Sequence, residues 1–110
     1  MFDYALEARL AKVAAMNGMS LIDGLYSHDK DWAHRIDPLR LDIASDCNCI
    51  VGQLSGSYND NVQYFTRGDK PQTFGFYETK NVSFSALTTA YQKLILCRQV
   101  QSKQQLLLAA

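Results

Sequence analysis

Residues 83–95, SFSALTTAYQKLI, have the apolar pattern on which the fold prediction depends. Ser83 is a residue type that favours helix starts, and the apolar positions after it recur at spacings of three, four and one. This pattern predicts an amphipathic helix that could run past Val100 toward Leu106. Its apolar stripe is also a candidate surface for a homodimer. The stripe consists of Phe84, Leu87, Tyr91, Leu94 and Ile95.

The N-terminal residues give a second helical pattern. Alanine is frequent there and favours helix, and acidic side chains stand in the first turn, where the helix dipole stabilises them. We therefore predict a helix over residues 3–16. Apolar positions that share one face of this helix, at spacings of three and four, are Leu6, Leu10, Val13 and Met16 or Asn17.

The end of this first helix has two interpretations. Asn17-Gly18 is a typical stop, because glycine readily takes the left-handed conformation found after helix ends. Ser20 and Asp23 then have the spacing of a capping box, which would begin a short second helix through Tyr26. The alternative is one bent helix over residues 3–26.

The middle of the chain predicts shorter elements. Residues 29–36 are expected to form a turn or two of helix in which Trp32 and Ile36 face inward together. Residues 39–43 alternate between apolar and polar and are predicted as an extended segment across the core, because a lone short strand has no obvious partner. The remaining predicted elements are helices over residues 47–56 and 58–66 and a loop over residues 67–81.

Together these patterns predict a mainly α fold. We expect a single-domain bundle of four to five helices with one short extended segment (39–43) and an aromatic loop (67–81) that folds back on the core. The helical domain is predicted to cover residues 1–100. Residues 101–110 are polar and then apolar, and would extend the last helix or fray.

Composition is that of an ordinary globular chain. Its 110 residues are 47% hydrophobic and 20% charged, with a formal net charge of zero. No apolar run approaches the ~20 residues that cross a bilayer, and acidic residues near the N-terminus argue against a secretion signal. Three cysteines, an odd number, fit a reducing compartment. We therefore expect a cytoplasmic protein without membrane contact.

Charge is distributed unevenly along the chain. Residues 1–55 contain five Lys or Arg and eight Asp or Glu, whereas residues 56–110 contain six and three. The two halves could attract each other within the fold or a dimer, or a basic helix could meet an acidic partner. Nucleic-acid binding is therefore an alternative function. The residues that would carry it are Lys80, Lys93, Arg98 and Lys103.

The pair Cys47-x-Cys49 invites a test for a metal site, which Cys97, His28 and His34 could complete. Inside a helix this spacing sends the two sulfurs to faces about 200° apart, and no second pair follows. We therefore predict no metal and no cofactor, interpret Cys49 and Cys97 as small buried apolar residues, and place His34 at the surface.

Catalytic signatures are also missing from the sequence. Neither a nucleophile elbow nor a phosphate-binding glycine loop is present. We therefore predict no catalytic residues and a chain that is not an enzyme. A small metal-binding or catalytic domain is kept as an alternative.

Aromatic residues are concentrated in residues 58–77. Tyrosine and phenylalanine are favoured both in cores and at protein interfaces, and a domain of this size cannot bury all of them. This stretch is therefore a candidate surface for a protein partner. The candidate binding residues are Tyr58, Tyr64, Phe74, Phe76 and Tyr77.

Four short motifs lie in the middle of the chain. They are Trp32-x-x-Arg35-Ile36-Asp37, Leu41-Asp42-Ile43, Gly75-Phe76 and, most specific, CIVGQLSGSY at residues 49–58. On these motifs, residues 20–96 resemble a group of small uncharacterised proteins of actinobacteria and their phages. The resemblance implies a genomic setting and no activity. It also implies that Trp32, Gln53 and Tyr58 form one structural unit, while residues 60–74 depart from the group's glycine-rich pattern.

These observations predict a small non-enzymatic protein that binds a macromolecule. Size, neutral charge, surplus aromatic residues and the resemblance favour a phage or mobile-element accessory protein with a protein partner, and an anti-defence role is one version of it. The C-terminal Leu108-Ala109-Ala110 resembles the apolar ending of bacterial proteolysis tags.

Overall fold

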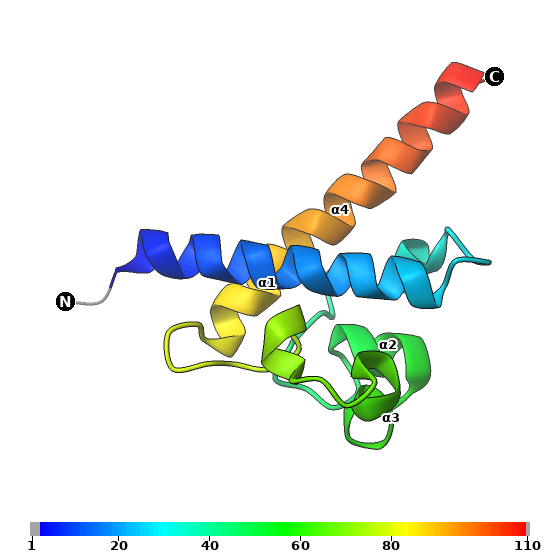
Figure 1. Cartoon of the computed structure of the whole chain (residues 1–110). Coiled ribbons are helices and arrows are strands. Elements are labelled where there is room, and N and C mark those ends of the chain that lie inside the picture. Colours follow the sequence, from blue (N-terminus) through cyan, green and yellow to red (C-terminus); the bar gives the residue numbers. More distant parts are fainter. Residues whose placement is uncertain (1–2, 110) are drawn as a thin grey trace.

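The computed structural model describes residues 3–109, and for residues 104–107 and 109 it describes the backbone alone. Within these residues the chain forms four α-helices, two 3₁₀ turns and no β-strand, arranged as one helical globule (Figure 1). The predicted mainly α fold is therefore confirmed. In chain order the elements are α1 (Tyr4–Leu25), η1 (Trp32–Arg35), α2 (Ile50–Ser55), α3 (Tyr58–Thr66), η2 (Pro71–Phe74) and α4 (Phe84–Ala109), where η marks a 3₁₀ turn.

Helix α1 is continuous and does not break at Gly18. It begins after Asp3, whose carboxylate accepts a hydrogen bond of 3.1 Å from the backbone N–H of Leu6. The predicted stop at Gly18 and the second helix from Ser20 are therefore wrong, and the alternative of a single helix over residues 3–26 gives the correct extent. A glycine ends a helix only where the chain can turn away, and here burial of the surrounding face holds the helix straight through it.

The face of α1 that packs on the core differs from the predicted leucine and valine face. Leu6, Leu10, Val13 and Met16 are 40–57% exposed, so the side that they share points to solvent. Small side chains on the opposite side let α4 and η2 approach α1 closely, and that approach decides which side is buried. The buried positions of α1 are Ala11, Ala15, Gly18, Met19 and Ile22.

Helix α4 packs against α1 and crosses it obliquely, and both helices run from left to right in Figure 1. Near the start of both helices the Glu7 carboxylate accepts a hydrogen bond of 3.0 Å from the backbone N–H of Ser83. Near the end of α1, Asp23 forms an ion pair of 2.6 Å with Arg98. Ser83 caps α4 as predicted, since its hydroxyl oxygen accepts a hydrogen bond from the backbone N–H of Ala86. Beyond the ion pair of Arg98 with Asp23, α4 projects away from the other helices (Figure 1).

The predicted apolar stripe of α4 lies in the core. Leu87, Tyr91 and Ile95 are buried, and Phe84 and Leu94 are half-buried at the edge of the core. These side chains therefore contribute to the fold of the single chain. Among the side chains of α4 that the structure describes, the large apolar ones left exposed are Leu96, Val100 and Leu108.

The segment between α1 and α2 packs largely as predicted. Trp32 and Ile36 are both buried, and the indole N–H of Trp32 donates a hydrogen bond of 2.8 Å to the Asp23 carboxylate. Residues 39–43 form turns and irregular backbone, so the predicted extended segment is wrong. Two of the three apolar positions of this segment, Leu41 and Ile43, are buried, whereas the third, Leu39, is 93% exposed because it lies in the turn after Pro38.

Helix α2 begins at Ile50, later than the predicted start at residue 47. Cys49 has extended backbone and acts as the cap of this helix, since its sulfur accepts a hydrogen bond of 3.3 Å from the backbone N–H of Gly52. Ser57 caps α3 in the same way, and α3 coincides with the helix predicted over residues 58–66. The two short helices lie side by side (Figure 1).

The segment 67–81 folds back on the core, as predicted. The backbone turns at Gly75, which has φ of 68° and lies directly against the α1 backbone, where a larger residue would be strained. Phe76 is buried with its ring centroid 6.4 Å from that of Tyr91. The Tyr91 hydroxyl donates a hydrogen bond to the carbonyl of Phe74 and thereby ties this segment to α4.

The predicted tail continues helix α4 through residue 109. Leu108 is 87% exposed, but Ala110 lies outside the described residues, so the proteolysis-tag interpretation of the last three residues stays a prediction. No helix in the part of the chain that the structure describes is long and apolar enough to span a membrane.

Candidate functional site

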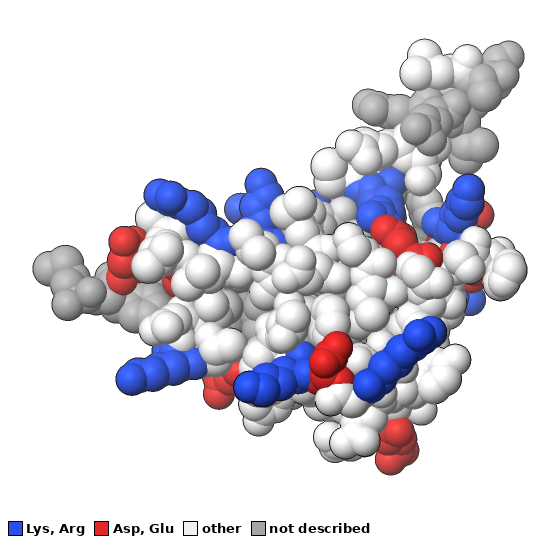
Figure 2. All heavy atoms as spheres, viewed as in Figure 1, with Lys and Arg blue, Asp and Glu red and all other residues white. Residues whose placement is uncertain are grey.

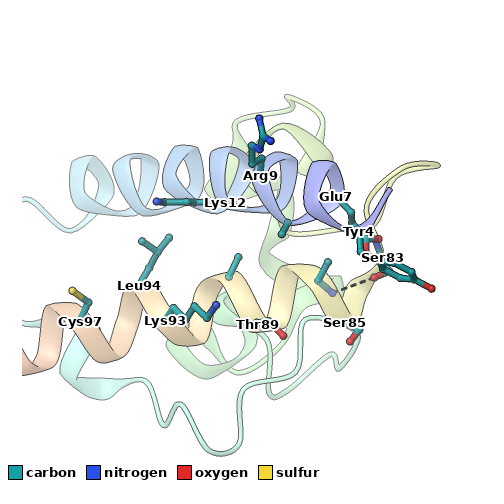
Figure 3. A pocket seen from close by; sticks show the side chains of 13 residues that line it. Tyr4, Glu7, Arg9, Lys12, Ser83, Ser85, Thr89, Lys93, Leu94 and Cys97 are labelled. Atoms are coloured by element: carbon teal, nitrogen blue, oxygen red, sulfur yellow. Dashed lines mark hydrogen bonds between the residues drawn. The ribbon is translucent and has the colours of Figure 1, made fainter. Parts of the chain in front are cut away.

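A groove of about 790 Å³ runs between α1 and the first half of α4 (Figure 3). It extends from Tyr4 and Ser85 at one end to Cys97 at the other. One wall of the groove is formed by α1 and the other by α4. The groove is lined mainly by apolar surface and is open to solvent, so it is the candidate binding site of the described residues.

The floor of the groove is lined by small and aliphatic side chains. Ala8 is contributed by α1, while Ala86, Ala90 and Leu94 are contributed by α4. The three residues from α4 are half-buried, so they belong to the rim of the core and still face the open groove. Figure 3 shows Leu94 pointing from α4 toward α1. A floor of this kind offers apolar contact and lets a second backbone approach closely.

Basic side chains flank this apolar floor. Arg9 and Lys12 belong to α1 and Lys93 belongs to α4, and all three are exposed. Figure 2 shows Lys and Arg side chains spaced along the upper edge of α1, on the side from which α4 emerges. Among the described residues the ion pairs are Arg35–Asp29 and Arg98–Asp23, so the three groove cations have no carboxylate partner there.

The acidic residue in the groove lining is Glu7, which lies at one end of the groove. Glu7 accepts the hydrogen bond from the Ser83 backbone N–H, which fixes its carboxylate at the start of α4. Cys97 lies at the other end and is exposed, so the prediction that it is buried is wrong. Its place on α4 falls beside the core stripe rather than in it, because Ile95 and Arg98 occupy the inward positions of that turn.

The aromatic residues predicted to bind a partner are placed in different environments. Phe76 is buried and Phe74 half-buried, so both contribute to packing of the loop on the core. Tyr58 stacks on Tyr77 with ring centroids 6.5 Å apart, and burial raises the pKa of Tyr58 to about 12. Tyr64 is 76% exposed and packs against the edge of Phe65 instead. The five residues therefore do not make one continuous surface.

The basic residues predicted for nucleic-acid binding are also separated. Arg98 pairs with Asp23 and lies over the Trp32 ring, 5.4 Å from its centroid, so it takes part in the fold. Lys80 lies in the loop before α4, and Lys103 lies on the projecting part of that helix. Lys93 alone of this set lines the groove.

Cysteine and histidine side chains are dispersed. Cys49 is buried and burial raises the pKa of its thiol, whereas Cys47, His28 and His34 are exposed, as predicted for His34. Within residues 3–109 no three His, Cys, Asp or Glu side chains gather closely enough to hold a metal ion.

Sequence reasoning missed Arg9 and Lys12. The available signal was the absence of acidic side chains from residues 8–22, beside alanines that recur in both helices. Comparison of the chain with protein-family models, curated proteins and solved structures gave no match.

Proposed function

We propose that this protein is a helical binding module and that the groove between α1 and α4 takes an α-helix of another protein. The observation that carries the proposal is an open, apolar-floored groove with α1 as one wall and α4 as the other. Recognition of an amphipathic helix by such a groove is a recurrent mode of protein binding.

The dimensions of the groove suit a short helix. Its lining on α4 runs from Ser85 to Cys97, which corresponds to about 18 Å at 1.5 Å per residue, or three to four helical turns. Ala8, Ala86 and Ala90 leave room for a third helix to approach the pair at the usual packing distance. Leu94 supplies a larger apolar contact toward the Cys97 end of the groove.

The proposal agrees with the expectation of a non-enzymatic accessory protein. A small chain that modulates a host or viral protein needs one adequate binding surface and no catalytic group. A phage or mobile-element origin, with an anti-defence role as one version, extends the same proposal and rests on the resemblance of residues 20–96. A homodimer that uses the exposed Leu96 and Val100 of α4 would leave the groove open for this partner.

Selection from a displayed library of random 18-residue peptides tests the proposal. The full-length chain is the bait, and each enriched peptide is measured against Ala90→Phe, which fills the floor, and against Ala44→Phe, which adds the same side chain at an exposed position elsewhere. We expect Ala90→Phe to weaken binding at least ~10-fold and Ala44→Phe to leave it unchanged, and the bound peptides to become helical by circular dichroism.

A second blocking variant covers the case in which Ala90→Phe does not fold. Thr89 lines the groove and is exposed, so Thr89→Trp obstructs the groove without altering the core. Peptides that bind both blocking variants as tightly as the unmodified chain would show that the groove is not the binding surface and would overturn the proposal.

A further inference from the structure

We infer that the helix bound in this groove is acidic along both edges of its apolar face. The inference rests on the proposed function, because it specifies the chemistry of the partner for the same groove. The juxtaposition that carries it is Arg9 and Lys12 on one wall with Lys93 on the other, above an apolar floor.

The positive charge of this rim is not compensated locally. From residue 8 to residue 22 helix α1 contains no acidic residue, and the chain contains none after Glu78. Glu7 is held by the Ser83 backbone at the end of the groove rather than beside the three cations. A partner that places carboxylates above Arg9, Lys12 and Lys93 therefore finds complementary charge on both walls.

The spacing of the cations predicts a pattern in the partner. Arg9 and Lys12 are separated by three residues and lie on successive turns of α1, with the Lys12 side chain nearer to α4 than that of Arg9 in Figure 3. Acidic residues three or four apart on one edge of the bound helix can meet this pair, while one acidic residue on the opposite edge can meet Lys93. The apolar face between the two edges covers Ala86, Ala90 and Leu94.

A protein helix fits these features better than other acidic ligands. A nucleic acid would offer phosphates to the basic rim, but its backbone would leave the apolar floor of Ala90 and Leu94 without an apolar partner. The projecting half of α4 from a second copy is also disfavoured, because its ionisable side chains within residues 96–109 are Cys97, Arg98 and Lys103 and none is acidic.

The peptides selected above supply the probes for this inference. We expect enriched sequences to carry Asp or Glu on both edges of an apolar helical face, and their affinity to fall as salt rises from 50 to 500 mM. We expect the triple variant Arg9→Glu, Lys12→Glu, Lys93→Glu to weaken binding at least ~10-fold and to bind versions of the peptides with Lys in place of Glu.

A matched triple variant controls for net charge. Lys30→Glu, Lys70→Glu and Lys80→Glu make the same total change at exposed positions outside the groove and should leave affinity within about twofold. Enriched peptides that are neutral or basic, or an equal loss of affinity in both triple variants, would overturn the inference that the partner is acidic. The proposed function would still stand in that case if peptide binding depends on the groove.

A duplex DNA of 20 base pairs is tested in parallel by fluorescence anisotropy at 50 mM salt. We expect no binding that depends on the groove cations. DNA binding that is lost in the Arg9, Lys12 and Lys93 triple variant but retained in Ala90→Phe would assign the basic rim to nucleic acid and overturn the inference.

Discussion

The Tyr91 hydroxyl lies against the Cα of Gly18, in the space that a β-carbon at position 18 would occupy. From there it donates a hydrogen bond to the Phe74 carbonyl. One buried phenol therefore joins α1, α4 and the end of η2, and the absence of a side chain at Gly18 makes this junction possible. The binding groove has the same two helices as its walls, so this junction fixes the spacing of the walls.

Substitution of Gly18 by alanine should destabilise the protein. The added methyl group overlaps Tyr91 and the Phe74 carbonyl, and overpacking of a filled core typically costs about 1–3 kcal/mol. Urea unfolding followed by the fluorescence of Trp32, the single tryptophan, measures the free energy of unfolding.

Gly24→Ala is the matched control, because Gly24 lies in the same helix and a β-carbon there meets nothing within 4 Å. Alanine at that position should stabilise α1 by about 0.5–1 kcal/mol through its higher helix propensity. Equal effects of the two substitutions would contradict the close packing of Gly18 on Tyr91.

Substitution of Asp23 by alanine should destabilise the protein more than loss of a surface ion pair. The Asp23 carboxylate accepts hydrogen bonds from the Trp32 indole and the Arg98 guanidinium. Its removal leaves the donor of a buried Trp32 without this acceptor, which typically costs about 1–3 kcal/mol. Thermal unfolding gives the difference.

The comparison variant is Arg35→Ala, which removes the ion pair of Arg35 with Asp29. Both side chains of that pair are well exposed, so its loss should cost less than about 1 kcal/mol. A larger effect of Arg35→Ala than of Asp23→Ala would argue against the structural role of Asp23.

Stability should fall as the pH rises above about 9. Burial raises the pKa of the Cys49 thiol from 9.0, raises the pKa of Tyr58 from 10.0 to about 12, and raises the pKa of Tyr91 well above 10.0. Between pH 9 and 12 the unfolded chain therefore releases these protons before the folded chain does. Their contribution to stability is fully present below pH 9 and is lost progressively above it.

Urea unfolding at pH 8 and pH 11 tests this alkaline loss. Tyr58→Phe removes one of the shifted groups and should show a smaller loss between the two pH values than the unmodified chain. Tyr64→Phe, at an exposed position, should behave like the unmodified chain. Stability that is constant from pH 8 to pH 11 would contradict the burial of these groups.

Bound helical peptide should protect Cys97 from alkylation. Cys97 lies at the end of the groove and is exposed, Cys47 is exposed outside it, and Cys49 is buried. In the free protein N-ethylmaleimide should modify Cys47 and Cys97, with Cys49 reacting only on unfolding. Mass spectrometry of the digested protein gives the rate at each site.

Saturating peptide should slow the modification of Cys97 and leave the rate at Cys47 unchanged. Cys47 is thus an internal control within the same chain. Slowing of both cysteines to the same degree would indicate a general effect on stability, and an unchanged rate at Cys97 would place the peptide elsewhere.

Helix starts and several inward-facing side chains could be predicted from the sequence. Ser83 begins α4 as predicted, and Ser57 caps the helix predicted over residues 58–66, because a serine cap needs only the backbone N–H groups of the next turn. The core stripe of α4 and the inward orientation of Trp32 and Ile36 were also predicted correctly. In each case the chemistry that decides the outcome lies within a few residues along the chain.

The error in α1 has a different cause. Leucine and valine positions and alanine positions both recur at helical spacing there, so either face could have been the buried one. The structure buries Ala11, Ala15 and Gly18, because these let Tyr91 and η2 approach closely, and leaves Leu6 and Val13 in solvent. Gly18 thus serves helix packing and does not end the helix.

Capping, periodicity and composition are local properties of the chain, so the helical fold, the start of most helices and the absence of acidic residues after Glu78 follow from the sequence alone. Packing between helices determines which face of α1 is buried and brings Arg9, Lys12 and Lys93 to one groove. Arg9 and Lys93 are far apart in the sequence, and their proximity follows from the packing of α4 on α1, a long-range contact with no local signature.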